Sequence, residues 1–230
     1  WLFIDPLFVP KLEALQDKLP NVKGFVVLTR AEKMPETSLK NVHCYESLIA
    51  NESSDFEWPE LDENAASALC YTSGTTGNPK GVVYSHRSTV LHCYASSLPD
   101  AFGLSRNDVI MPIVPMFHVN GWGIVYSAPM SGSKLVMPGP KMADGQTLTA
   151  LINQEKITMS AGVPTVWLAL LQYLEASVET IDSLERVTVG GAACLLSIFT
   201  TFKDKHGVDT EHAWGMTEMS PLGTYNKMSD

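Results

Sequence analysis

Short apolar runs alternate along the chain with longer stretches in which apolar residues return every three or four positions. Runs of the first kind indicate buried strands when turn-forming residues bound them, and stretches of the second kind indicate amphipathic helices. The runs predict strands at residues 24–29, 65–70, 82–84, 109–114, 134–137, 158–161, 186–189 and 209–213. The amphipathic stretches predict helices at residues 6–19, 45–50, 86–97, 147–155, 165–176 and 195–205.

This alternation predicts an α/β fold with a mainly parallel sheet flanked by helices on both faces. Ligands of such sheets bind beyond the carboxyl ends of the strands. Turns rich in glycine or aromatic residues follow three of the predicted strands, after Val114, Val189 and Ala213. We therefore expect these turns to meet at one crevice. Ser85 precedes one predicted helix and is suited to cap it.

The most distinctive stretch lies between two predicted strands and reads YTSGTTGNPKG at residues 71–81. Its hydroxyls and backbone amides suit phosphate oxygens, its glycines let the backbone approach a ligand, and Lys80 adds a positive charge. The phosphate loop of mononucleotide kinases requires Gly directly before the lysine and Ser or Thr directly after it, whereas Pro79 and Gly81 stand there. A flexible Ser/Thr/Gly turn is the plain alternative, yet so many such groups together favour an anion-binding loop.

Two further turns carry residues suited to a nucleotide. Trp214 offers a ring for a flat base, and Glu218 offers a carboxylate for a hard cation such as Mg²⁺. Gly190 and Gly191 have no side chain, so a flat ring can approach their backbone closely. Each signal is weak alone, because Gly-Gly turns and exposed glutamates are common.

Composition excludes some classes of protein. The chain has 230 residues, 45% of them hydrophobic, and a net charge of −9. These values predict a packed core and argue against a nucleic-acid or anionic-membrane binder, which needs a basic face. Four scattered cysteines favour free thiols in a reducing compartment. No apolar run reaches the roughly 18 residues of a membrane helix, so no transmembrane segment is expected.

Two of these stretches together resemble a known family. Residues 71–81 are similar to the phosphate-binding loop of the adenylate-forming (AMP-binding) enzymes, which include acyl-CoA synthetases, luciferases and peptide-synthetase adenylation domains. Residues 214–218 resemble the family's second signature, although most members carry Tyr where Trp214 stands. The resemblance implies that residues 1–230 are part of the large N-terminal domain, without the start of its first subdomain and without the C-terminal domain that bears a lysine.

The resemblance also implies roles for individual residues. Catalytic roles fall to Lys80, Thr217 and Glu218, with Thr217 on the AMP phosphate. Mg²⁺ is implied at Thr72 and Glu218. The implied nucleotide-binding residues are Thr72, Ser73, Gly74, Thr75, Thr76, Gly77, Lys80, Gly190, Gly191, Ala192, Trp214, Gly215, Met216 and Thr217.

A third segment narrows the resemblance to one branch. Residues 115–118 with Trp122 resemble the fatty-acyl-CoA synthetases, including the medium-chain and methylmercaptopropionate ligases. That branch implies an acyl pocket formed by His118, Trp122, Val163 and Gly190. Taken alone, His118 is more often a structural hydrogen-bonding residue than a catalyst, and no acidic neighbour supports a triad.

The implied function is ATP- and Mg²⁺-dependent activation of a carboxylic acid, of fatty type, to acyl-AMP and then to acyl-CoA, with CoA as co-substrate. Small molecules are the expected partners, a homodimer is left open, and the expected location is cytoplasmic. Two alternatives remain: another adenylate-forming enzyme of peptide-synthetase or luciferase-like type, or a nucleotide-binding fragment that is inactive on its own.

Overall fold

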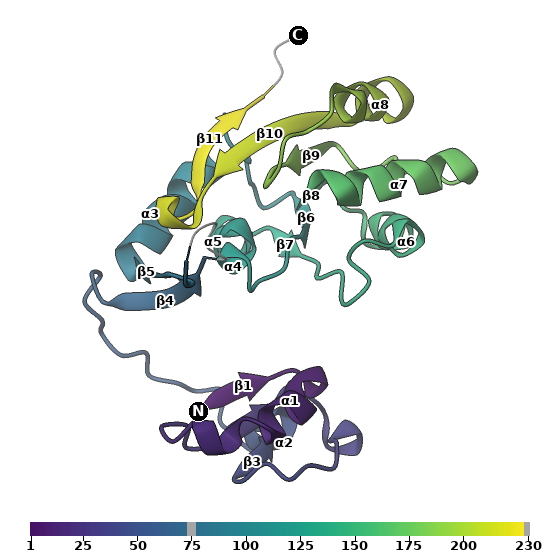
Figure 1. Cartoon of the computed structure of the whole chain (residues 1–230). Helices are drawn as coiled ribbons and strands as arrows, with labels where there is room; N and C mark the ends of the chain where they lie inside the picture. The colour runs from purple at the N-terminus through teal and green to yellow at the C-terminus, as the bar shows by residue number, and fades with distance from the viewer. Residues whose placement is uncertain (73–76, 228–230) are drawn as a thin grey trace. The chain divides into compact units, whose positions relative to one another are not determined.

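The computed structural model describes residues 1–72 and 77–227 (Figure 1). The chain divides into two compact units, residues 1–60 and residues 61–230. Within the described residues, no helix combines the length and the apolar character that crossing a membrane requires. All four cysteines are free, as expected.

The first unit contains a three-stranded parallel sheet in the order β1-β2-β3. Its strands are β1 (Leu2–Ile4), β2 (Phe25–Val27) and β3 (Val42–Cys44), and helix α2 (Tyr45–Ile49) follows the last of them. The position of α2 confirms the helix predicted at 45–50. Strands β1 and β3 were not predicted, because each has only three residues and therefore shows little periodicity.

The single helix predicted at residues 6–19 is wrong. Three short pieces replace it: a 3₁₀ turn at Pro6–Phe8, helix α1 (Val9–Glu13) and a 3₁₀ turn at Gln16–Lys18. Pro10 explains the first interruption, because it has no N–H to continue a helix from the preceding turn and instead occupies the first turn of α1. The apolar spacing is present, but the backbone cannot follow it.

The second unit is built on a six-stranded sheet in the order β11-β10-β9-β8-β6-β7. All neighbouring strands are parallel except β10 and β11, which are antiparallel. The strands are β6 (Val109–Ile113), β7 (Lys134–Leu135), β8 (Met159–Gly162), β9 (Arg186–Val189), β10 (Asp209–Gly215) and β11 (Leu222–Asn226). The predicted mainly parallel sheet is confirmed, although β7 is shorter than expected and β11 was not predicted.

Helices cover both faces of this sheet (Figure 1). Ile110 of β6 packs into one apolar cluster with Phe102 and Ile124, whereas its neighbour Met111 packs into another with Trp167. Successive strand residues thus face opposite layers, so each face has its own core. The helices are α3 (His86–Ser97) and α5 (Ile124–Ser131) on the first side, and α6 (Gly145–Glu155), α7 (Pro164–Ala176) and α8 (Leu196–His206) on the second.

The glycine-rich stretch sits on a separate two-stranded antiparallel sheet formed by β4 (Ala66–Tyr71) and β5 (Gly81–Ser85). The amide of Thr72 donates to the Lys80 carbonyl at 2.9 Å and closes the hairpin below its loop. Ser85 then caps α3 through reciprocal bonds with Ser88, which confirms the predicted cap.

A left-handed turn follows β6 at the carboxyl edge of the sheet. All five residues from Val119 to Gly123 have positive φ, a conformation that bulky and β-branched residues rarely adopt. Residues 119–122 are labelled α4 in Figure 1. The sequence predicted a turn here, but neither its handedness nor helix α5 directly after it.

Candidate active site

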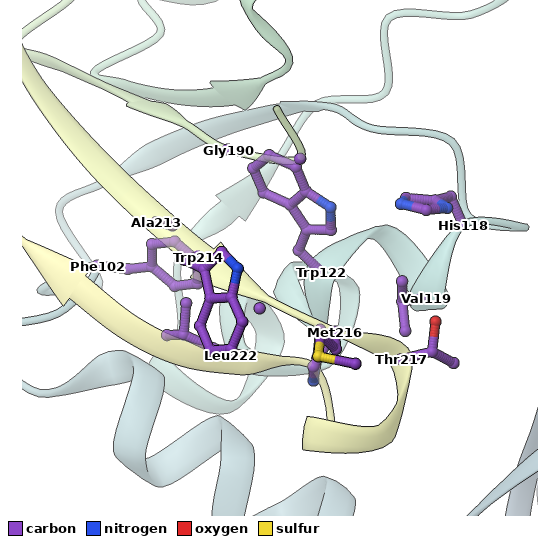
Figure 2. Close-up of a pocket in the computed structure, with 13 residues that line it drawn as sticks. Phe102, His118, Val119, Trp122, Gly190, Ala213, Trp214, Met216, Thr217 and Leu222 are labelled. Carbon is purple, nitrogen blue, oxygen red and sulfur yellow. The ribbon is translucent and has the colours of Figure 1, made fainter. Parts of the chain in front are cut away.

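The three turns that the sequence predicted at strand ends do meet at one cavity. It has a volume of about 210 Å³ and lies beyond the carboxyl ends of β6, β9 and β10 (Figure 2). Its lining residues are Phe102, His118, Val119, Trp122, Gly190, Gly191, Ala213, Trp214, Gly215, Met216, Thr217, Pro221 and Leu222. Eight of these were candidate site residues: His118, Trp122, Gly190, Gly191, Trp214, Gly215, Met216 and Thr217.

Trp122 packs on the backbone of Gly190 and Gly191, and its ring extends toward Gly190 in Figure 2. A Cβ added at Gly190 would lie 3.0 Å from the Trp122 ring and 2.9 Å from the Ala213 carbonyl oxygen. A Cβ at Gly191, which has a φ of +77°, would lie 3.2 Å from Cγ1 of Val163. A side chain at Gly190 would displace the indole or the neighbouring strand, and the positive φ of Gly191 favours glycine there.

The loop between β10 and β11 forms another wall of the cavity. Gly215 pairs with Leu222, and the Met216 amide donates to the Pro221 carbonyl at 3.0 Å. A side chain on Gly215 would collide with that carbonyl, because its Cβ would lie only 2.1 Å from the oxygen. A 3₁₀ turn at Thr217–Met219 occupies the tip of the loop.

The two candidate residues of this loop, Thr217 and Glu218, differ in their position relative to the cavity. Thr217 is half-buried and lines the cavity, whereas Glu218 is exposed and does not. Within residues 1–72 and 77–227, the Glu218 carboxylate has no hydrogen-bond or ion-pair partner. Trp214, 48% exposed, packs against Gly223, where an added Cβ would lie 2.9 Å from its ring. The rest of the indole remains accessible from the cavity.

Tyr84 connects this loop to the glycine-rich hairpin. Its hydroxyl donates to the Thr217 carbonyl oxygen at 2.5 Å, and its side chain is 5% exposed among Cys70 and Val119. Burial, together with the nearby Cys70 and Glu218, raises the pKa of the Tyr84 hydroxyl, so the group keeps its proton and acts as the donor. The hairpin base and the Thr217–Glu218 turn are therefore in direct contact.

The remaining candidates lie around the cavity or outside the described residues. Thr72, Gly77, Lys80 and Glu218 do not line the cavity, and neither does the exposed Ala192. Val163 does not line this cavity but lies directly behind it, where its Cγ1 would be 3.2 Å from a Cβ added at Gly191. Four candidates lie outside the described residues: Ser73, Gly74, Thr75 and Thr76.

Sequence reasoning missed five lining residues: Phe102, Val119, Ala213, Pro221 and Leu222. Two of them had a usable signal. Ser220–Pro221 is a turn dipeptide, and alternating residues follow it from Leu222, so a returning strand was detectable. Phe102 had none, because it reaches the cavity only through the packing of the segment after α3.

The candidate metal-binding residues suit a divalent cation that is held mainly by the oxygens of a bound phosphate ligand and only partly by the protein. Among the described residues, no group of three His, Cys, Asp or Glu side chains gathers to hold a metal. Mg²⁺ commonly takes only one or two protein carboxylates and completes its shell with phosphate oxygens and water. The exposed Glu218 carboxylate fits that limited role. The Thr72 hydroxyl is less available, since it is directed to the Lys80 carbonyl at 3.4 Å.

An α/β fold with a cavity at the carboxyl edge of its sheet is typical of proteins that bind a ligand there, and here a glycine-rich hairpin lies against the rim of that cavity. The sequence profile of one family, described as AMP-binding enzyme, matches residues 3–230, and the chain belongs to that family.

Similar proteins were found among both sequences and solved structures. The 3-methylmercaptopropionyl-CoA ligase of Ruegeria lacuscaerulensis is 51% identical over 225 residues, covering 98% of this chain and 42% of the ligase. The medium-chain-fatty-acid–CoA ligase of Ectopseudomonas oleovorans is 48% identical over 225 residues, covering 98% of this chain and 41% of that ligase. The crystal structure of an anthranilate CoA ligase with anthranoyl-AMP superposes with a TM-score of 0.86 at 22% identity, covering 100% of this chain and 43% of that one. The chain thus spans less than half the length of these proteins.

Proposed function

We propose that residues 1–230 are the ATP- and acyl-binding part of an AMP-forming acid–CoA ligase. In this reaction a carboxylate oxygen attacks the α-phosphate of ATP and expels pyrophosphate, which leaves acyl-AMP. The thiol of CoA then attacks the acyl carbon and releases AMP. The observation that carries the proposal is the contact between Tyr84 and Thr217, because it brings the glycine-rich hairpin against the Thr217–Glu218 turn at the cavity.

The arrangement suggests how the nucleotide would be held. The base would lie in the slot between the Gly190–Gly191 backbone and the accessible part of the Trp214 ring. The phosphates would then extend toward Thr217 and the hairpin loop, where Lys80 supplies positive charge. Glu218, with the hydroxyl of Thr72, would hold Mg²⁺, which neutralises charge on the phosphates when bound. Positioning and charge neutralisation are the main contributions such a transfer needs from protein.

The apolar part of the cavity supports an aliphatic acid. Phe102, Trp122 and Leu222 provide hydrocarbon surface. In Figure 2 the polar side chain of His118 lies on the side of Trp122 that faces away from Phe102 and Leu222. Two relatives that cover nearly all of this chain are named for 3-methylmercaptopropionate and for medium-chain fatty acids. We propose an acid of that type, and we place the reaction in the cytoplasm, where ATP, CoA and free thiols coexist.

An acid panel tests the proposal. The full-length protein is supplied with ATP, Mg²⁺, CoA and one acid at a time, from propionate to palmitate and including 3-methylmercaptopropionate, and acyl-CoA is measured. We expect product with aliphatic acids and little with amino acids. Pyrophosphate exchange that depends on an amino acid or an aromatic acid instead would assign the chain to another kind of adenylate-forming enzyme.

The non-enzymatic alternative needs a separate measurement. Isothermal titration of ATP into the 230-residue chain, with and without Mg²⁺, separates binding from turnover. ATP binding without product from any acid in the full-length protein would support a nucleotide-binding role alone.

A further inference from the structure

A second, smaller hollow lies beside the loop that carries Thr217 and Glu218. Side chains from β5, α3 and α5 line it on one side, and the end of the β10–β11 loop lines it on the other. The residues that matter here are Tyr84, His92, Gly123, Tyr126, Ser220 and Pro221. Two of them, Tyr84 and His92, bond to the backbone of the loop, and the proposed reaction gives neither of them a role.

Tyr84 holds the first end of the loop. Its hydroxyl donates to the Thr217 carbonyl, and the buried ring cannot swing away because it packs with Cys70 and Val119. Tyr84 belongs to β5, whose first residue, Gly81, follows Lys80 directly. The bond therefore sets the distance between the glycine-rich hairpin and the turn that bears Glu218.

His92 holds the other end. The Leu222 amide donates to Nε2 of His92 at 3.4 Å, a long bond, and the imidazole is 8% exposed. The ring lies close against Gly123, where an added Cβ would come within 2.6 Å of it. Because Nε2 accepts a hydrogen bond, the imidazole must be neutral, and burial lowers the pKa of His92 to about 4, which keeps it so.

The residues between these two bonds have few anchors of their own. The Met216 amide reaches the Pro221 carbonyl and the Met219 amide reaches the Met216 carbonyl, both inside the loop. Neither bond fixes the loop against the rest of the site. Apart from the pairing of Leu222 with Gly215, the hydrogen bonds that fix the loop to its surroundings within the described residues come from Tyr84 and His92, at its two ends.

We propose that Tyr84 and His92 are positioning residues that fix both ends of the Thr217–Leu222 loop, so that Thr217 and Glu218 face the phosphates and Mg²⁺ of the bound nucleotide. This inference rests on the proposed function of Thr217 and Glu218. Neither residue touches substrate; each acts only through the backbone of the loop. Their loss should weaken Mg²⁺·ATP binding more than acid binding, because Thr217 and Glu218 face the nucleotide and Leu222 alone in this loop belongs to the surface proposed for the acid.

Tyr84→Phe tests the first contact, because it removes the hydroxyl and keeps the ring. In the full-length protein we expect the Kd and KM for Mg²⁺·ATP to rise about 3- to 10-fold, the range for loss of one hydrogen bond. The KM for the acid should change less than about 2-fold, well below that range. Tyr126→Phe is the matched control, since Tyr126 lines the same hollow and no described residue bonds its hydroxyl; it should behave as the parent.

A pair of substitutions tests the second contact. His92→Leu removes the acceptor and should raise the Kd for Mg²⁺·ATP at least as much as Tyr84→Phe does. His92→Gln keeps a side-chain oxygen that can accept from the Leu222 amide, so it should recover much of the loss. If His92→Leu does not fold, Tyr84→Phe alone decides the question through the same titration, and parental affinity in that variant would overturn the positioning role.

The outcomes separate this inference from the proposed function. A parent protein that neither binds Mg²⁺·ATP nor forms acyl-CoA would overturn both. A working parent whose Tyr84→Phe and His92→Leu variants bind Mg²⁺·ATP with parental affinity would overturn only the positioning role. Equal weakening for the acid and the nucleotide would also overturn it, since that pattern indicates a general loss of structure.

Discussion

The Tyr84 hydroxyl donates to the Thr217 carbonyl oxygen at 2.5 Å, although 133 positions separate the two residues. This contact joins the hairpin that carries Lys80 to the turn that carries Glu218. On the proposed function, a phosphate chain held by the hairpin loop and a cation held by the turn would belong to one nucleotide.

Replacing Glu218 with Ala should lower adenylation at least about tenfold, on the scale of losing one key electrostatic group in an active site. The carboxylate is exposed and lacks a partner among the described residues, so its removal should leave the fold intact. Acid-dependent pyrophosphate exchange in the full-length protein measures the effect. Glu52→Ala, an exposed glutamate of the first unit, is the control. Exchange near the parental level would remove Glu218 from the site.

Gly190→Ala should lower the free energy of unfolding and distort the proposed acyl pocket. The new methyl group would lie 2.9 Å from the Ala213 carbonyl and 3.0 Å from the Trp122 ring, so strand β10 or the indole must shift. Overpacking of this kind costs about 1–3 kcal/mol. Urea unfolding should report that loss, and the KM for the acid should rise. Gly139→Asn is the control, because Gly139 has open space around it and Asn tolerates its positive φ.

The burial of neutral His92 predicts a loss of stability in acid. Its pKa is lowered to about 4 in the folded protein from an ordinary value of 6.5. Above pH 6.5 neither the folded nor the unfolded state is protonated there, so His92 makes no difference to stability. Between 6.5 and about 4 only the unfolded state takes up the proton, so the free energy of unfolding falls by up to roughly 3 kcal/mol.

The comparison with His92→Gln isolates this effect from other titrating groups. Urea unfolding of the two proteins at about pH 7 and about pH 4.5 gives the difference, since the unfolded-state histidine is protonated only at the lower value. The parent should lose more stability than the variant. Equal losses would show that His92 is protonated in the folded state as readily as in the unfolded one.

A buried ion pair supports the side of the cavity formed by Phe102. Arg186 pairs with Asp108 at 2.8 Å, both side chains are largely buried, and the same guanidinium donates to the Phe102 carbonyl. Arg186→Met leaves Asp108 without its charge partner, which should cost about 3–5 kcal/mol. The exposed pair of Lys40 and Asp17 is the control, because Lys40→Ala should cost less than about 1 kcal/mol. Similar losses from the two substitutions in urea unfolding would contradict the assignment.

Much of this arrangement was predictable from local patterns. The hairpin around residues 71–81, the Ser85 cap and the parallel sheet follow from short-range signals, and the convergence of three turns follows from the rule that ligands bind at carboxyl edges. Each of these depends on residues close together in the sequence or on a general property of parallel sheets.

The other features of the fold and the site depend on contacts between residues far apart in the sequence, which no local pattern predicts. The Leu222 amide meets His92 across 130 positions, and the left-handed turn at residues 119–123 is held by tertiary packing against Gly190 and His92. The broken helix at residues 6–19 is a different case, because Pro10 interrupts the apolar spacing and is visible in the sequence.

The central claim is that the glycine-rich hairpin and the Thr217–Glu218 turn bind one nucleotide together. Isothermal titration of ATP, with and without Mg²⁺, into the protein and its Lys80→Ala and Glu218→Ala variants tests it most directly. We predict one site that Mg²⁺ tightens, about tenfold weaker binding in each variant, and loss of the Mg²⁺ dependence in Glu218→Ala alone. Parental affinity in both variants, or an unchanged response to Mg²⁺ in Glu218→Ala, would contradict the account.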